Sequence, residues 1–516
     1  MSKHTIIAIV LVVVGVLGVV IFRLVLPQIK QDYAYGTSDA KNLKGEVSIA
    51  LDSWIGYFPL QSPVFKKLMR EEGYKVKIID DEANYPERMK NLAKSKVNFA
   101  VCTIDSYLIG GAREDFPATI IAIIDESKGG DAVVAWQDKI PNLDKLKELD
   151  NYRIAFTPDS PSDHLLKSIA VHFGIPLLLD KSGSWRIETM GAEDAYKKLL
   201  SKKADIAVIW EPYVTNSLSK KGIVKLLGTE DTEKLIIDIL LVSRTYSKNN
   251  PDVAKLVVEK YFETQNIYKE NPSILEEDII RHTRDKAADV RSMLKGVRWV
   301  GFKENIQWFG ISTSSSTYRD ELITSINSTI KILLENEDFP SNPLPGEDPY
   351  TIINSSYVEY FYISGKFVGT DTLVAANPLE KEFTALTRAQ WDKLKVVGSL
   401  KLRPITFRSG TAELDTSGEL QLDMIVDNVK HYPNFRIIIE GHTGKRGDPE
   451  ANRMLSQNRA DKVKEYMVDY YNMDSERIFS KGMGNLKPLK RKDGESSRSY
   501  EDRLKRVEIY FVEAGI

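Results

Sequence analysis

Val47-Ser-Ile-Ala-Leu51 opens a regular alternation of short apolar runs and amphipathic segments. Val64–Glu72 and Glu87–Ser95 have helical periodicity, whereas Lys75–Ile79 and Phe99–Thr103 are short runs typical of strands. A strand–helix–strand order of this kind forms a parallel sheet with right-handed crossovers. We therefore predict an α/β fold that begins near residue 45.

The same alternation of strand and helix patterns begins again after Leu146. Its strands and helices are expected, in chain order, at Arg153–Phe156, Asp163–Phe173, Trp185–Thr189, Ala192–Ser201 and Ile206–Ile209. Two such units side by side predict two lobes. Ligands of open α/β sheets bind at the carboxyl ends of the strands, so the crevice between two lobes becomes a closable cleft.

Five turn segments of this region resemble nitrate/sulfonate/taurine-type periplasmic solute-binding proteins. They are Ser53–Pro59, Val97–Thr103, Asp125–Asp131, Phe156–Ser162 and Asp205–Pro212. The resemblance covers roughly Gly45–Glu270 and implies a two-lobed type 2 periplasmic-binding-protein fold. The module is expected at 45–339, with its second lobe at about 145–235.

The expected ligand-binding residues are Trp54, Tyr57, Thr103, Asp125, Ser160, Ser162, Trp210 and Glu211. Two serines at a helix start either bind a polar ligand group or simply cap the helix. The aromatic residues either stack on a ligand or pack within their loops. Asp125 and Glu211 would suit a cationic or amino group and disfavour nitrate, although Glu211 could equally be a surface charge.

A second pattern near the C-terminus contains the motif Ile439-Glu-Gly441-His442-Thr443. The expected order there is β-α-β-α-β-β. Its members are strand Pro404–Phe407, a helix opened by the capping box Thr416–Glu419, strand Phe435–Ile439, helix Asn452–Tyr470, a short strand at Ile478 and strand Arg506–Val512.

This pattern resembles the peptidoglycan-binding C-terminal domain of the OmpA-like family over about 400–512, so we place the domain at 398–516. The resemblance implies a peptidoglycan site formed by Thr443, Gly444, Asn452, Leu455, Arg459 and Arg506. In the family, an Asp after His-Thr and an Arg before Ala hold the diaminopimelate of the peptide stem.

Arg459 matches the family's arginine, and a guanidinium suits a bidentate clasp on a carboxylate. Arg459 could equally be a helix-surface residue. Gly444 replaces the aspartate and supplies no acceptor for an ammonium group, which predicts weakened or altered binding. Asp448 is one candidate to replace that carboxylate, and His442 is expected to make a hydrogen bond within the turn.

The chain from Asp252 to residue 397 is predicted to form helices followed by a connector. Asp252–Tyr268, Ile274–Ala288 and Arg319–Leu334 are periodic and are expected to complete the first lobe. Residues 340–397 read as a Pro-rich connector, with short aromatic strands within Ile352–Val368.

The run Ile6–Phe22 contains only apolar residues and Gly, long enough with its flanks to span a bilayer as a helix. We predict an uncleaved signal anchor at 1–27 and a linker at 28–44. A cleaved signal peptide is the alternative. A lipoprotein anchor is disfavoured because the one cysteine, Cys102, lies far downstream. The span holds no acidic residue, so it resembles a tether rather than a proton path.

Composition narrows the function further. The 516 residues carry a net charge of −2, which disfavours a nucleic-acid partner. One cysteine and six histidines without HxxxH spacing predict neither a metal site nor a cofactor. No nucleophile–base pair is evident, so we expect no enzyme.

These patterns predict a single-pass inner-membrane protein with its bulk in the periplasm. It would be tethered to the peptidoglycan peptide stem and would capture a small polar solute for a transporter or sensor partner. The alternative is a structural envelope anchor linking inner membrane and peptidoglycan, whose solute-binding-like module acts as a protein-interaction scaffold.

Overall fold

A computed structural model describes residues 43–149, 151–284, 286–311, 320–367, 383–401, 404–408 and 410–515. Among these residues no helix is both long and apolar enough to span a bilayer. The expected anchor at Ile6–Phe22 lies outside the described residues, as does nearly all of the linker, so both stay predictions.

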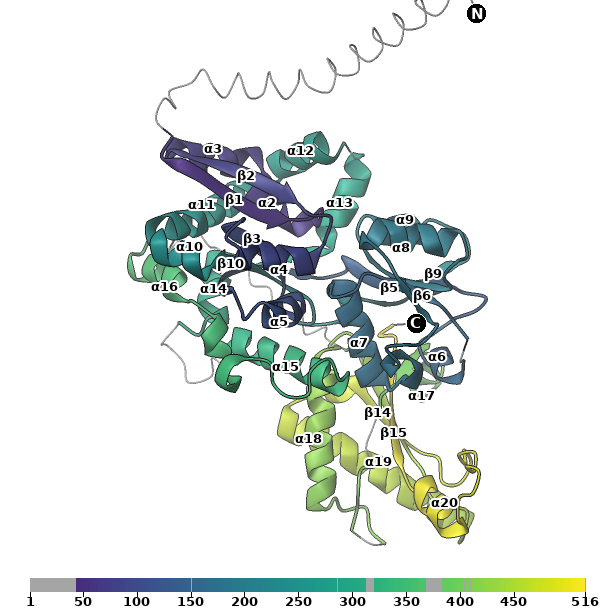
Figure 1. Cartoon of the computed structure of the whole chain (residues 1–516). Coiled ribbons are helices and arrows are strands. Elements are labelled where there is room, and N and C mark those ends of the chain that lie inside the picture. The colour runs from purple at the N-terminus through teal and green to yellow at the C-terminus, as the bar shows by residue number, and fades with distance from the viewer. Residues whose placement is uncertain are drawn as a thin grey trace, which may run out of the picture.

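A six-stranded mixed sheet forms the centre of the first lobe (Figure 1). Its strands, in spatial order, are β11 (Val297–Trp299), β4 (Ala118–Ser127), β10 (Ile237–Ser243), β3 (Phe99–Thr103), β1 (Gly45–Leu51) and β2 (Tyr74–Asp80). As predicted, β1 runs parallel to β2 and β3. Strand β10 runs antiparallel to β3 and β4 because the chain returns through it from the second lobe.

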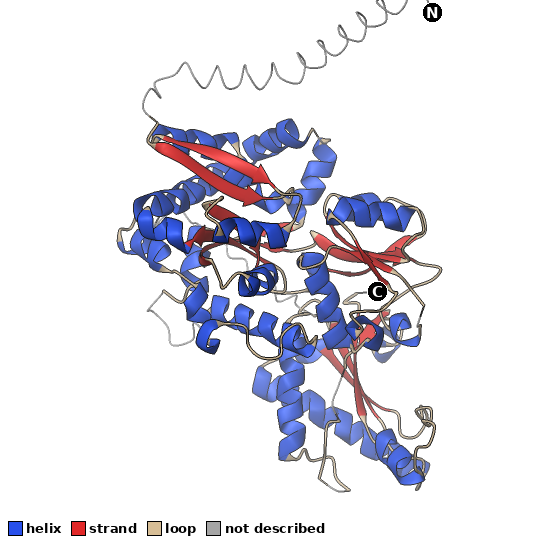
Figure 2. Cartoon of the chain, viewed as in Figure 1, coloured by secondary structure: helices blue, strands red, loops and turns tan. Residues whose placement is uncertain are grey.

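Helices flank this sheet (Figure 2). They are α2 (Phe58–Gln61), α3 (Pro63–Glu71), α4 (Tyr85–Ala93), α5 (Ile104–Arg113), α10 (Arg244–Asn249), α11 (Pro251–Glu270), α12 (Pro272–Thr283), α13 (Ala287–Lys295), α14 (Phe302–Trp308) and α15 (Glu321–Glu335). The helix expected at Ile274–Ala288 is two helices, because Arg284 adopts a left-handed conformation (φ 64°) that ends α12.

The second lobe has a five-stranded sheet. Its strands, in spatial order, are β7 (Arg186–Glu188), β6 (Ile154–Phe156), β8 (Ile206–Trp210), β5 (Asp131–Trp136) and β9 (Ile223–Gly228). Its helices are α6 (Lys145–Glu148), α7 (Pro161–Phe173), α8 (Gly191–Leu200) and α9 (Tyr213–Leu218). Since β5 belongs to this sheet, the lobe begins before the expected residue 145.

The expectation of short aromatic strands within Ile352–Val368 is wrong. This segment contains helix α16 (Ser356–Ile363). Tyr357, Val358 and Phe361 are buried on one side of the helix and join the first lobe's core. Aromatic residues favour strands on average, but here their spacing of one, three and four residues fits a helix face. The first part of the expected connector thus completes the first lobe.

The C-terminal domain has a four-stranded sheet. Its strands, in spatial order, are β12 (Val396–Ser399), β15 (Val507–Val512), β13 (Arg436–Gly441) and β14 (Ile478–Gly482). Its helices are α17 (Arg388–Trp391), α18 (Thr416–Lys430), α19 (Pro449–Tyr471) and α20 (Ser497–Leu504).

Two details of the expected β-α-β-α-β-β order differ. The first strand is β12 instead of Pro404–Phe407, where Phe407 makes only an isolated bridge to Leu414. Helix α20 precedes the last strand and was not expected. The rest of the order is as predicted, with β13 parallel to β14 and antiparallel to β15.

The C-terminal domain, green to yellow in Figure 1, packs directly against the second lobe. The ring of Phe173, at the end of α7, lies 5.5 Å from that of Tyr432 and 6.1 Å from that of Phe511. A side chain on Gly398 would begin 2.8 Å from the Phe173 ring, so glycine permits this close contact. The two units therefore share a continuous apolar core.

We predict that Phe361→Ala lowers the free energy of unfolding by about 3–5 kcal/mol, because it leaves a cavity in the first lobe's core. Tyr360→Ala is the matched control, since the Tyr360 side chain is 51% exposed while Phe361 is 1% exposed. Denaturant melts of both variants give the comparison. Equal losses would contradict the packing of α16.

Candidate functional site

Two connections join the lobes, residues 128–130 between β4 and β5 and residues 229–236 between β9 and β10. Thr229 links them, because its Oγ1 accepts hydrogen bonds from the backbone N–H groups of Gly129 (2.9 Å) and Asp131 (3.1 Å). This paired crossing brings the ends of β4 and β10 to the boundary between the lobes.

A pair of buried carboxylates lies at this boundary. Asp125 on β4 and Asp238 on β10 are register partners on antiparallel strands, and are 0% and 2% exposed. The turn after β1 supplies donors to both. The Trp54 indole Nε1 donates to Asp125 Oδ1 at 3.2 Å, and the Tyr57 hydroxyl donates to Asp238.

Burial raises the pKa of Asp125 to about 7, and the charge of Asp131 adds to the effect. Burial and the neighbouring Asp125 raise the pKa of Asp238. Burial also raises the pKa of Asp131 to about 7, and its Oδ1 has no hydrogen-bond partner among the described residues. Carboxyl groups that face each other and are excluded from water hold a proton until a positive charge replaces it.

All eight residues expected to bind the ligand are buried, at no more than 6% exposed: Trp54, Tyr57, Thr103, Asp125, Ser160, Ser162, Trp210 and Glu211. The structure brings Trp54, Tyr57 and Asp125 together. Trp210 ends β8 in the second lobe, and Thr103 ends β3 in the first. Whether these residues bind a ligand stays a prediction.

The polar groups among these residues bond within the protein. Glu211 accepts from the backbone N–H (3.0 Å) and the hydroxyl (2.7 Å) of Thr215, so it caps the start of α9. Ser160 donates to the carbonyl oxygen of Thr157 at 2.6 Å, and its hydroxyl lies 3.0 Å from that of Ser162. Ser160 stands at the N-cap position of α7, but its side chain makes no capping bond.

The lobes touch each other directly. The Ser106 hydroxyl on α5 donates to the carbonyl oxygen of Asp159 in the second lobe at 2.8 Å, and it also lies 2.9 Å from the Thr103 hydroxyl. Arg113 of the same helix forms an ion pair with the Asp159 carboxylate. The lobes are therefore closed onto each other in this structure.

The sequence patterns did not identify Asp238 as a residue of this site. It lies within the apolar run Ile237–Ser243, where one acidic residue interrupts a buried strand. A lone carboxylate in such a run is itself a signal, because buried charge is costly unless it is paired or functional. Its position opposite Asp125 follows only from the pairing of β10 with β4.

The second candidate site is the turn after β13. Gly444 occupies the position of the family's aspartate, and a Cβ there would lie only 2.5 Å from Oε2 of Glu501. The same oxygen accepts a hydrogen bond from the backbone N–H of Lys445 at 3.1 Å. Helix α20 thus brings a half-buried carboxylate against the turn at the point where the chain lacks one.

Glu501 was also missed from the sequence, because α20 was not expected and Glu501 is distant from Gly444 along the chain. Asp448, one earlier candidate for this carboxylate, caps α19 instead by accepting from the backbone N–H of Ala451 at 2.8 Å.

The other expected wall-binding residues surround α19 and the turn. Arg459 stacks its guanidinium 4.9 Å from the Phe407 ring and donates from Nε to the Thr411 carbonyl at 3.1 Å, and its terminal nitrogens make no hydrogen bond to another described residue. Asn452 donates to the Arg446 carbonyl at 2.9 Å.

Three more of the expected wall-binding residues have mixed surroundings. Leu455 is half-buried on α19. Arg506, just before β15, donates from Nε to Glu508 on that strand at 2.7 Å. The buried Thr443 hydroxyl has no hydrogen-bond partner among the described residues. The wall-binding role of the whole set stays a prediction.

Comparison with known proteins identifies the class of the C-terminal domain. Residues 406–502 match the OmpA family, so this part of the chain is an OmpA family domain. Outer membrane protein Omp38 of Acinetobacter baumannii is 29% identical over 106 residues, covering 20% of this chain and 30% of Omp38. The peptidoglycan-associated lipoprotein of Buchnera aphidicola is 27% identical over 166 residues, covering 31% of this chain and 86% of the lipoprotein.

Solved structures similar to the chain include two periplasmic binding proteins. The aliphatic sulphonate binding protein SsuA of Escherichia coli is 15% identical with a TM-score of 0.43, covering 58% of this chain and 94% of SsuA. The nitrate-binding protein NrtA of Synechocystis PCC 6803 is 14% identical with a TM-score of 0.41, covering 59% of this chain and 92% of NrtA.

We predict that the contribution of the Asp125–Asp238 pair to stability falls as the pH rises from about 4 to about 7. Both groups have folded-state pKa values above the unfolded value of about 3.9, so the pair binds more protons in the folded chain in this range. Asp125→Asn removes one of these charges and should flatten the fall, leaving the variant more stable than wild type at pH 8 by at least about 1 kcal/mol.

Melting temperatures between pH 4 and pH 8 test this expectation. Asp252→Asn is the matched control, because its side chain is 92% exposed. A variant Asp125→Asn that follows the wild-type pH profile would contradict the protonated pair.

Proposed function

We propose that this protein binds a small cationic solute between its two lobes while its C-terminal domain holds the cell wall. The observation that carries the proposal is the buried pair Asp125 and Asp238 at the lobe boundary. Two carboxylates in a closed, dry site require a counter-charge or a proton. A cleft between two hinged lobes is a place where such a counter-charge can enter and leave.

The surroundings of the pair favour an amine over an anion. Trp54 and Tyr57 place aromatic rings beside the carboxylates, and aromatic faces attract ammonium groups. An ammonium group would replace the proton that the pair holds when the site is empty. A sulfonate or nitrate ion would instead bring a second acceptor group and no positive charge to the carboxyl groups of Asp125, Asp131 and Asp238, which disfavours both ligands.

Entry of a solute requires the lobes to separate. The contacts that close them are both polar and apolar. The polar ones include the Ser106 bond to the Asp159 carbonyl, the half-exposed Arg113–Asp159 ion pair and the 3.1 Å approach of the Thr215 and Ser292 hydroxyls. Buried residues of the second lobe such as Trp210 and Val214 also join the first lobe's apolar core. Exposed ion pairs contribute about 1 kcal/mol or less, so opening would mainly have to separate the apolar contacts. Residues 128–130 and 229–236 would act as the hinge.

For peptidoglycan binding, we propose that Glu501 supplies the carboxylate that the family's aspartate provides and that Gly444 lacks. A zwitterionic amino-acid centre of a peptide stem needs an acceptor for its ammonium group and donors for its carboxylate. Glu501 supplies the acceptor beside the Thr443–Gly444 turn. Arg459 offers its terminal guanidinium nitrogens for the carboxylate.

The remaining parts of the proposal rest on the sequence. Ile6–Phe22 would anchor the chain in the inner membrane, with the described residues in the periplasm, and a transporter or sensor would receive the solute. The peptidoglycan-associated lipoprotein among the relatives supports an envelope location by its name.

A second candidate function is a structural envelope anchor whose two-lobed module serves as a protein-interaction scaffold. One observation favours it: all eight residues expected to bind a ligand are buried by the protein's own side chains. The scaffold and solute-binding functions differ in whether any small molecule binds the lobes.

A thermal-shift screen of the protein distinguishes these functions. We expect primary or quaternary amines to raise the melting temperature, because a ligand that binds only the folded state stabilises it. Alkyl sulfonates and nitrate should give no shift, and Asp238→Asn should abolish the shift by the amines. A shift by sulfonates that survives Asp238→Asn would contradict the cationic solute, and no shift by any compound would favour the scaffold.

We predict that Glu501→Gln weakens binding to purified peptidoglycan by about 10–100-fold, because it removes a charged acceptor worth about 1.5–3 kcal/mol. Arg459→Ala should weaken it similarly. Asp502→Asn is the matched control, since Asp502 neighbours Glu501 on α20 but is exposed and pairs with Lys505. Sedimentation with insoluble wall material gives the bound fractions, and unchanged binding by Glu501→Gln would remove Glu501 from the site.

A further inference from the structure

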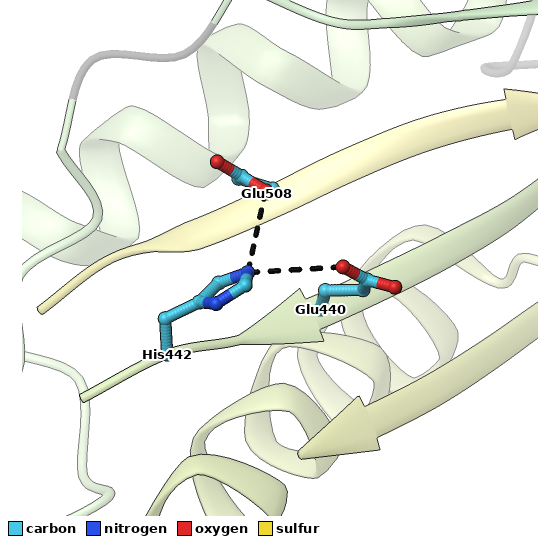
Figure 3. A group of neighbouring side chains, drawn as sticks. All are labelled: Glu440, His442 and Glu508. Atoms are coloured by element: carbon cyan, nitrogen blue, oxygen red, sulfur yellow. Dashed lines mark ion pairs between the residues drawn. The ribbon is translucent and has the colours of Figure 1, made fainter. Parts of the chain in front are cut away.

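Three ligand-type side chains converge where β13 meets the turn (Figure 3). Glu440 on β13 and Glu508 on β15 are register partners on antiparallel strands. His442 follows β13 by one residue and points its imidazole between them. Its Nε2 lies 3.3 Å from Glu508 Oε2 and 3.8 Å from Glu440 Oε2.

The imidazole of His442 is buried and unsatisfied. Its side chain is 1% exposed, and neither ring nitrogen makes a hydrogen bond with any described residue. The expectation of a hydrogen bond within the turn is therefore wrong. Leaving a buried polar group unpaired costs about 1–3 kcal/mol, so an occupant that satisfies the ring would stabilise this corner of the domain.

We propose that Glu440, His442 and Glu508 bind a divalent metal ion of the zinc type. Zinc takes one imidazole nitrogen and two carboxylate oxygens at about 2.0–2.2 Å, with water in a fourth, tetrahedral position. Bonds of that length place neighbouring ligand atoms about 3.3–3.6 Å apart. The N–O separations of 3.3 and 3.8 Å match this spacing with only small movements.

The surroundings support such a site. Arg506 donates to the other carboxylate oxygen of Glu508, Oε1, at 2.7 Å, and the Tyr510 hydroxyl donates to Oε2 at 2.5 Å. Outer partners of this kind orient carboxylate ligands toward a metal. One imidazole nitrogen and two carboxylate oxygens form a ligand set that suits zinc or a neighbouring transition metal. Calcium is less suited, because it prefers a larger number of oxygen ligands.

One side chain competes with the metal. The Lys487 ammonium lies 3.0 Å from Glu440 Oε2, the same oxygen that faces His442. Lys487 is about half exposed, so its ammonium can turn to solvent when a cation arrives. Lys487 is therefore a competitor whose removal should strengthen metal binding. The bound ion would join β13 to β15 directly beneath the Thr443–Gly444 turn.

The test uses the full-length protein, stripped of metal by a chelator and then titrated with Zn²⁺ against a chromogenic competitor. We expect one ion per chain and a raised melting temperature in the wild type. Lys487→Ala should bind at least as tightly. His442→Ala should bind at least tenfold more weakly, and His282→Ala, which alters an exposed histidine of the first lobe, should bind like the wild type.

Glu508→Gln provides a second variant if His442→Ala does not fold, because it keeps the side-chain shape while removing one charged ligand. Co²⁺ substitution gives an independent readout, since a tetrahedral site produces intense visible absorption that both variants should lose. No stoichiometric binding by the wild type would overturn the proposal, as would Zn²⁺ binding or a Co²⁺ spectrum unchanged in the His442 and Glu508 variants. None of these results depends on whether the domain binds the wall.

Discussion

The arrangement of both lobes depends on the burial of Asp125 opposite Asp238. Two facing carboxylates away from water cannot both be ionised without a counter-charge. Their positions follow from the topology, because β10 returns from the second lobe between β3 and β4 and brings Asp238 into register with Asp125. The turn after β1 then closes over both through Trp54 and Tyr57. The boundary between the lobes is thus built around two buried carboxyl groups.

The C-terminal domain is part of the same structural unit as the second lobe. Helix α7 begins with Ser160 and Ser162 beside the lobe contact and ends with Phe173 packed on Tyr432 and Phe511. The two units share one apolar core. The first lobe also contacts the C-terminal domain, because the Ser328 hydroxyl of α15 lies 2.8 Å from Nε2 of His431. A closing movement of the lobes must therefore be accommodated along α15.

The sequence predicted what local periodicity determines and missed what strand pairing determines. The alternation from Val47 to Thr103 located five elements correctly, because period and crossover rules act over short segments. The Ile439–Thr443 motif located an OmpA family domain. Helix α16 was read as strands because its aromatic content outweighed its spacing.

The misses at the two sites have a common physical origin. Asp238 and Glu501 each act through a neighbour distant in sequence, Asp125 and Gly444 respectively. No local pattern specifies such a pair. The burial of all eight expected ligand-binding residues likewise depends on how the lobes close, which periodicity does not determine.

The most direct test of the account is the proton balance of solute binding. Calorimetric titration at pH 6.5, in two buffers of different ionisation enthalpy, measures the protons released when the best-stabilising amine binds. We predict release of roughly one proton, since burial raises the pKa values of the facing Asp125 and Asp238, so the pair holds a proton in the empty site and the ammonium takes the proton's place. Proton uptake, or binding with no proton exchange, would contradict it.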